Sequence, residues 1–332
     1  MAIFGRDTAI DLGTAYTRIH VRRVGLVLDE PSLVAVADGQ VIAAGIEAQR
    51  MIGLAGISIE HPVRHGAIAD LELAERMLRL FLRKVHKWRR LAPPCVAVAV
   101  PSGSTVVERR AVHDVAYRAG ARSVRLVETP VAAALGCGLS LRDAVAVLAV
   151  DVGAGSTDVA ILSLGGVVVA ETVKVGGDDV DHAIATHVQA EHAMLVGELA
   201  PEKWTDDGTG GLEINGRWKA TGLPGTVTLG AEEVGQAAVE PITAIVTTVR
   251  GVLESCPPEL SGDLMDRGIA LTGGGSLLHG LTDLLRKETR LPVQIADEPF
   301  YAVILGTASH LDGVETPRRP QRRKRKPKIA VG

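Results

Sequence analysis

Two apolar stretches flank the pattern aspartate, any residue, glycine at 11–13, and two more flank it at 151–153. A tight turn of small residues points successive backbone N–H groups at one spot, where an anion can bind. Glycine allows the close approach and the positive φ that such a turn needs. Mg²⁺ keeps most of its waters and needs only one or two carboxylates. The paired pattern therefore predicts a polyphosphate held between two hairpins, with Asp11 and Asp151 holding Mg²⁺ through water.

A third glycine turn, Gly273-Gly274-Gly275, follows the apolar stretch 268–271. We expect this turn to open a helix, whose first N–H groups are free to bind a ligand. One aspartate-glycine turn alone is more often structural, but two at domain spacing together with a third turn favour a nucleotide. A P-loop is excluded because no Walker lysine motif is present, and a Rossmann site because no G-x-G-x-x-G follows a strand.

Apolar strands that alternate with amphipathic helices must position these turns. We predict strands at 8–11, 18–21, 96–100, 124–127, 145–151, 159–162, 167–175 and 268–271, and helices at 71–87, 105–118, 180–196, 231–253 and 303–311. Asp178 is the predicted N-cap of helix 180–196. The stretch 198–224 is polar and glycine-rich, and it indicates no clear element. The alternation predicts an α/β protein with two similar lobes and a cleft between them.

The composition excludes several classes of protein. The 332 residues are 46% hydrophobic but only 3% aromatic, enough apolar side chains for a large aliphatic core. The three cysteines (95, 137 and 256) lie far apart, which excludes a disulfide framework and a thiolate zinc site and indicates a reducing compartment. We see neither an apolar run of membrane-spanning length nor a signal peptide, so we expect a cytoplasmic protein.

A basic, proline-punctuated tail ends the chain. Residues 317–328 hold eight Lys or Arg and no acid, although the net charge of the whole chain is −3. Such a tail cannot bury enough apolar surface to fold. It either attracts anionic lipid or nucleic acid, or only aids solubility, and the sequence does not choose between these alternatives.

Eight segments resemble, in order, the actin, DnaK and sugar-kinase ATPase superfamily and, within it, the bacterial actin homologues MreB and Mbl. They are DLGTAYT (11–17), EPSLVAV (30–36), HGAIADLELAERMLRLFLRKV (65–85), VPSGSTVVERRAV (100–112), ETPVAAALGCGL (128–139), DVGAGSTDVAILSLGG (151–166), VGGDDVDHAI (175–184) and GIALTGGGSLLHGL (268–281). The resemblance implies an actin-like ATPase fold of two ribonuclease H-like lobes with ATP or ADP and Mg²⁺ in the cleft. It places domain I at 1–139 plus about 300–313, and domain II at 140–299 with a shortened subdomain near 198–224. The basic tail is then 314–332.

The resemblance also assigns the nucleotide contacts. It implies phosphate contacts from both hairpins, a ribose contact from Glu202 and adenosine contacts from the third turn. The implied nucleotide-binding residues are Asp11, Gly13, Thr14, Ala15, Tyr16, Asp151, Gly153, Ala154, Gly155, Ser156, Gly177, Glu202, Gly274, Gly275, Ser276 and Leu277.

The chain departs from the family pattern at the position that activates water. The family reads Glu-Glu-Pro where this chain reads Glu128-Thr129-Pro130, and a threonine cannot act as a base near neutral pH. Glu128 is expected to point elsewhere, while Ser156 keeps a hydroxyl at a hydrolysis position. Tyr16 is bulky where the family has asparagine, Ala154 replaces a glycine, and the lysine after Glu202 is missing. We therefore predict nucleotide binding with slow or absent hydrolysis.

The resemblance implies a cytoskeletal protein that forms or joins membrane-associated filaments and organises cell-wall synthesis and cell shape. The implied partners are copies of itself, related MreB-type filaments, cell-shape membrane proteins and the wall-synthesis machinery, with nucleic acid not expected. Trp88 and Leu91, flanked by basic residues, and the tail are candidate contacts to an anionic membrane at the inner face of the cell membrane.

Two other functions remain as alternatives. The first is a nucleotide-binding regulatory or scaffold module that does not polymerise. The second is a small-molecule kinase, which is disfavoured because the matched segments supply no spare acid for a base. His182, His187 and His192 recur every five residues, the wrong spacing for two ligands on one helical face, so we predict surface residues.

Overall fold

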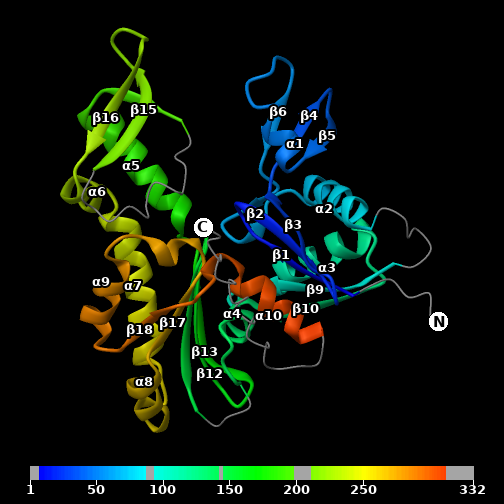
Figure 1. The fold of residues 1–332 in the computed structure, drawn as a ribbon, viewed down its shortest axis with the longest axis vertical. Helices are drawn as coiled ribbons and strands as arrows, with labels where there is room; N and C mark the ends of the chain where they lie inside the picture. Colours follow the sequence, from blue (N-terminus) through cyan, green and yellow to red (C-terminus); the bar gives the residue numbers. More distant parts are fainter. Residues whose placement is uncertain (1–6, 87–92, 142–144, 198–210, 312–332) are drawn as a thin grey trace, which may run out of the picture.

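Two five-stranded sheets of the same topology form the centre of the computed structural model, which describes residues 7–86, 93–141, 145–197 and 211–311 (Figure 1). The first sheet has the order β3-β2-β1-β9-β10, from Gly25–Pro31, Tyr16–Val21, Thr8–Leu12, Cys95–Val100 and Ser123–Glu128. The second has the order β13-β12-β11-β17-β18, from Gly166–Val173, Thr157–Ser163, Val147–Val152, Ile269–Thr272 and Val293–Ile295. In each sheet an antiparallel hairpin is followed by parallel strands. The predicted duplication is therefore confirmed.

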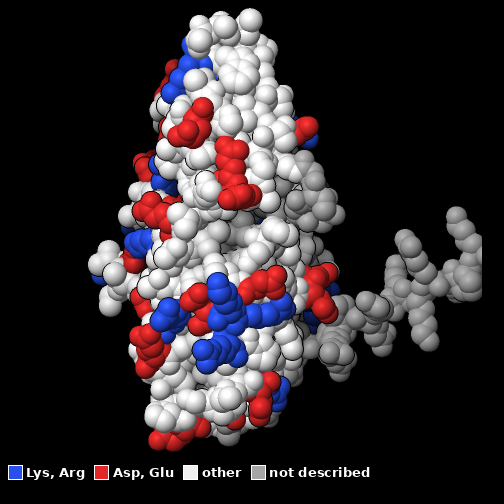
Figure 2. All heavy atoms as spheres, turned by 90° about the vertical axis from the view of Figure 1, so that its left-hand side faces the viewer, with Lys and Arg blue, Asp and Glu red and all other residues white. Residues whose placement is uncertain are grey.

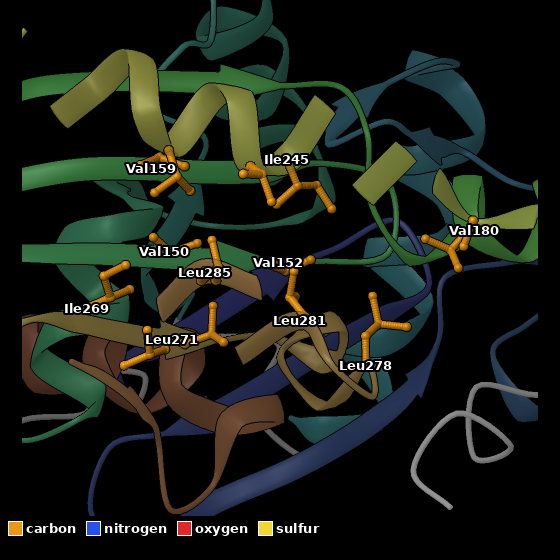
Figure 3. Packing of buried hydrophobic residues seen from close by; sticks show 14 of the residues in the cluster. Val150, Val152, Val159, Val180, Ile245, Ile269, Leu271, Leu278, Leu281 and Leu285 are labelled. Carbon is orange, nitrogen blue, oxygen red and sulfur yellow. The ribbon is translucent and has the colours of Figure 1, made fainter. Parts of the chain in front are cut away.

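Alternate residues of the second sheet pack against different helices. Val150, Val159 and their neighbours share a cluster with Ile245 of α7 (Val239–Glu254) and Leu285 of α9 (Leu281–Thr289) (Figure 3). Ala149 and Ala160 pack instead with α4 (Thr129–Gly136). Successive side chains of a strand point to opposite faces, so both faces of this sheet are covered.

The first sheet is covered in the same way. Its outer face packs on α2 (Leu71–Val85) and α3 (Val106–Ala119), which begin at the side-chain caps Asp70 and Thr105. Its inner face is alanine-rich and packs on α4 and α10 (Ala302–Leu311). Because α4 touches both sheets, α4 and α10 are the layer between the two lobes.

The helices α4 and α10 cross at two glycines. A Cβ on Gly306 would lie 1.7 Å from the Ala132 carbonyl oxygen, and a Cβ on Gly136 would lie 1.9 Å from that of Ala302. No side chain fits at either distance, so the crossing requires glycine at both positions.

Smaller elements extend each lobe away from the crossing. In the first lobe these are β4 (Val34–Ala37), β5 (Gln40–Ala44), α1 (Ile46–Gln49), β6 (Ser58–Glu60), β7 (Val63–Arg64) and β8 (Ala67–Ile68). In the second they are α5 (Gly177–Glu191), β14 (Met194–Val196), β15 (Leu212–Trp218), β16 (Pro224–Leu229), α6 (Ala231–Ala237) and α8 (Ser261–Arg267). The strands β14, β15 and β16 form an antiparallel sheet. The strand β15 lies in the stretch 198–224, where the sequence indicated no clear element, and β14 lies at the end of the segment 180–196, which was predicted as a helix.

Two predicted helices have different bounds. The single helix predicted at 231–253 is two helices that meet at Ala238, because Pro241 has no N–H to donate and would break a continuous helix. The helix predicted at 180–196 is α5 at 177–191, and its N-cap is Gly176 rather than Asp178. The Asp179 carboxylate accepts a hydrogen bond from the Gly176 N–H at 2.8 Å.

Charges of both signs are mixed on the side of the second lobe drawn in Figure 2. On α7 and α9, Arg250 pairs with Glu288 at 3.6 Å and Arg286 pairs with Asp283 at 2.8 Å. Among the described residues, none of the helices has the length and apolar character needed to cross a membrane.

Candidate nucleotide site

The two aspartate-glycine turns have the same hairpin geometry. The Gly13 N–H donates to the Tyr16 carbonyl oxygen at 3.1 Å, and the Gly153 N–H donates to the Ser156 carbonyl oxygen at 2.9 Å. Each aspartate lies near the end of the first strand of its hairpin. The sequence therefore predicted both turns correctly from the aspartate, the glycine and the apolar flanks.

The two hairpins meet across the gap between the lobes. A Cβ on Gly155 would lie 2.7 Å from Thr14 Oγ1 and 2.8 Å from the backbone nitrogen of His65. The Gly66 N–H donates to Thr14 Oγ1 at 3.0 Å, and a Cβ on Gly66 would lie 2.6 Å from Ser156 Oγ. The turn between β7 and β8, at His65 and Gly66, thus lies beside both hairpin tips.

Two aspartates lie behind the tips, Asp151 buried and Asp11 partly buried. Burial raises the pKa of Asp151 to about 7, against the hydrogen bond that its carboxylate accepts from Thr272 Oγ1 at 2.6 Å, and Asp158 and Asp11 raise it further. Burial also raises the pKa of Asp11, although Arg18 lies 3.5 Å away and opposes that rise. A divalent cation would offset the repulsion between these neighbouring carboxylates, and carboxylates are ligands that Mg²⁺ prefers. The donor set therefore fits a water-mediated Mg²⁺ ion.

Asp158 is a further buried carboxylate in this region, and its importance was not predicted from the sequence. Its Oδ1 accepts hydrogen bonds from the Ser102 N–H at 3.1 Å and from Thr172 Oγ1 at 2.6 Å. Burial raises its pKa to about 6. The sequence did contain a signal for Asp158. Once the hairpin turn at 153–156 is assigned, counting back along both strands places Asp158 directly opposite Asp151, and cross-strand partners lie side by side.

Glu128 and Thr129 lie at the start of α4. The Glu128 carboxylate accepts from Arg109 at 3.2 Å and from Ser102 Oγ at 3.3 Å. Thr129 is buried, with 8% of its surface exposed, and is the first residue of the helix. The carboxylate at this end of α4 is thus held by an arginine and a serine.

The remaining residues of the two hairpins contact neighbouring segments of their own lobes. Tyr16 is 39% exposed at the start of β2, with the Arg18 guanidinium 5.5 Å from its ring centre. The Ala15 carbonyl accepts from the Ser32 N–H at 2.8 Å. The Ala154 carbonyl accepts from the Asp178 N–H at 2.8 Å, and the Gly153 carbonyl from the Gly177 N–H at 3.0 Å. These last two bonds fix the N-terminus of α5 on the second hairpin.

The third glycine turn opens a short 3-10 helix rather than an α-helix, so that prediction is confirmed only in part. Residues Gly274–Leu277 form one 3-10 turn, and α9 begins only at Leu281. Gly273 has φ 80°, and a Cβ there would lie 2.2 Å from the Val152 carbonyl oxygen. Gly275 and Ser276 are buried, and a Cβ on Gly275 would lie 2.3 Å from Val152 Cγ1. Close packing against the end of β11 therefore explains two of these glycines.

Some predicted contacts lie outside the described residues. These are Glu202, the membrane candidates Trp88 and Leu91, and the basic tail at 314–332.

The paired sheets, the crossing helices and the facing hairpins define an actin-like fold, and solved structures agree. MreB5 of Spiroplasma citri bound to ADP superposes with a TM-score of 0.85 at 31% identity, covering 94% of this chain and 99% of that one. The same protein bound to AMPPNP gives a TM-score of 0.81. The MamK double helical filament, at 20% identity and a TM-score of 0.78, shares the fold.

Sequence comparison gives the family. The family model described as MreB/Mbl protein matches residues 5–319. The cell shape-determining protein MreB of Escherichia coli (strain K12) is 41% identical, over 94% of this chain and 95% of its own length. The chain belongs to the MreB/Mbl family of cell shape-determining, actin-like proteins.

Proposed function

We propose that this protein binds ATP and ADP with Mg²⁺ between the two hairpins. The observation that carries the proposal is the meeting of the hairpin tips at Thr14 and Gly155, in front of the buried Asp151 and the partly buried Asp11. Backbone N–H groups at both tips would hold the phosphates, and Asp11 and Asp151 would hold the waters of Mg²⁺. The ADP and AMPPNP complexes of MreB5 support this assignment.

Hydrolysis is proposed to be slow or absent. Thr129 stands where the resemblance expects a carboxylate, and its hydroxyl cannot take a proton near neutral pH. Glu128 is engaged by Arg109 and Ser102, which leaves it poorly placed to serve instead. Ser156 Oγ lies beside the Gly66 turn and would position water without activating it.

The proposed cellular role is that of a cytoskeletal protein in the cytoplasm. It would form or join filaments at the inner face of the membrane that organise wall synthesis and cell shape. Family membership supports the filament, and MamK provides a double helical filament built on the same fold. Contact with cell-shape membrane proteins and wall enzymes, and membrane contact through Trp88, Leu91 and the tail, are parts of the same proposal.

The test combines ATP titration with sedimentation. Purified protein with Mg²⁺ is titrated with a fluorescent ATP analogue, then sedimented with ATP, without ATP, and with anionic liposomes. ATP-dependent pelleting without liposomes supports a filament-forming protein. ATP binding without pelleting at high concentration would instead indicate a non-polymerising module, and no ATP binding would overturn the nucleotide site.

A further inference from the structure

Two histidines and a glutamate converge at the outer end of the second lobe, away from the hairpins. His187 Nε2 lies 3.0 Å from Glu233 Oε1, and His192 Nε2 lies 2.6 Å from the same oxygen. The two imidazole rings face each other edge to plane, with centres 6.4 Å apart. One ligand atom from each side chain lies within 4.8 Å of the other two.

The end of α5 explains why residues five apart can meet. The helix finishes at Glu191, and His192 is its C-cap with φ −107° and ψ 1°, so the helical spacing no longer applies to its ring. Ala193 then turns the chain with φ 50°. Glu233 comes from the first turn of α6. His187 and His192 lie at the surface as predicted, with 22% and 31% of their side chains exposed, but both also contact Glu233, which the sequence did not indicate.

The chemistry of the cluster suits a metal ion. Two imidazole nitrogens and one carboxylate oxygen are a donor set that Zn²⁺ takes with a water as fourth ligand. Tetrahedral zinc with bonds near 2.0 Å separates its ligand atoms by about 3.3 Å. The two distances from the histidine nitrogens to the Glu233 oxygen, 3.0 Å and 2.6 Å, are slightly shorter than that value. The three side chains are 22–31% exposed, which leaves a path for the ion and its water.

The charge state is also favourable. The hydrogen bonds from His192 and His187 lower the pKa of Glu233, so its carboxylate is ionised near neutral pH. Metal ligands must be deprotonated, and the Glu233 carboxylate meets this condition.

We propose that His187, His192 and Glu233 bind one divalent transition-metal ion of the zinc type, with water in the fourth position. The ion would join the C-terminal end of α5 to α6. The other end of α5 is fixed on the second hairpin by the Gly177 and Asp178 N–H groups. Metal binding would then fix the outer part of the second lobe to a helix that begins at the nucleotide site. The proposal does not depend on nucleotide binding.

The test uses untagged full-length protein with excess Mg²⁺, titrated with Zn²⁺ against a chromophoric chelator. We expect one tight site, and at least about a hundredfold weaker binding in His192→Gln and Glu233→Gln. His182→Gln is the matched control, because His182 lies on the same helix, is exposed and is outside the cluster; we expect it to bind as the wild type does.

Co²⁺ provides the independent readout. The wild type should show the visible d–d absorption of a four-coordinate Co²⁺ ion without a sulfur charge-transfer band, and His192→Gln should lose it. The presence of that sulfur band, equal Zn²⁺ affinity in wild type and both cluster variants, or no Zn²⁺ binding by the wild type would overturn the proposal.

Discussion

Replacing Gly155 by alanine tests whether the hairpin tips grip a phosphate. The added Cβ would lie 2.7 Å from Thr14 Oγ1, 2.8 Å from the backbone nitrogen of His65 and 2.9 Å from the Cα of His65. Ordinary contact needs about 3.5 Å, so the tips must separate by about 0.8 Å. Overpacking of this kind costs about 1–3 kcal/mol of stability.

The same separation should weaken nucleotide binding. A hydrogen bond to a charged group contributes about 1.5–3 kcal/mol, so losing one phosphate contact lowers ATP affinity by roughly ten- to hundredfold. The assay is titration of a fluorescent ATP analogue with Mg²⁺, alongside thermal unfolding. The control is Gly262→Ala, since Gly262 lies in α8 with no atom within 4 Å of its Cβ position. Gly155→Ala with unchanged ATP affinity and unchanged unfolding temperature would refute the hairpin assignment.

Three further substitutions give separate readouts. Thr129→Glu restores a carboxylate at the first residue of α4, so phosphate release should rise by roughly 10²–10⁴-fold; no rise in a variant that still binds ATP contradicts this role. Burial raises the pKa of Asp158 from 3.8 to about 6, so this group makes the free energy of unfolding fall as pH rises from about 4 to about 6. In denaturant unfolding across that pH range, the free energy of unfolding should fall less in Asp158→Asn than in the wild type. The same pH profile in both proteins would be evidence against a raised pKa of Asp158. Gly306→Ala would place a Cβ 1.7 Å from the Ala132 carbonyl oxygen and should destabilise the protein by about 3 kcal/mol in denaturant unfolding, while Gly262→Ala should not; a loss below about 0.5 kcal/mol argues against the close crossing.

The sequence was sufficient for features set by neighbouring residues. The Asp-x-Gly turns, the strand edges near them and the capped helices α2 and α3 all follow from local spacing and side-chain type. The duplicated pattern also predicted the duplicated sheet, because two similar local motifs at domain spacing need similar surroundings.

Features set by distant residues could not be predicted in this way. The His65-Gly66 turn reaches Thr14 and Ser156 only after the lobes have folded together. The hairpin register pairs Asp158 with Asp151, but the burial that raises the pKa of Asp158 depends on the packing of the folded lobes. The helix α5 ends at Glu191, so His192 does not follow the helical spacing. Its ring lies against Glu233 of α6 instead.

One helix joins the proposed hydrolysis position to the crossing between the lobes. Thr129 begins α4, and Gly136 ends it against Ala302 of α10. The crossing contacts α4 at Ala132 and at Gly136, which lie about 5 Å and about 10 Å along the helix axis from Thr129. A side chain at position 129 can therefore change water activation without entering the crossing, while an added Cβ at the crossing acts on stability first. Different outcomes for Thr129→Glu and Gly306→Ala would show that turnover and lobe packing are separable on the same helix.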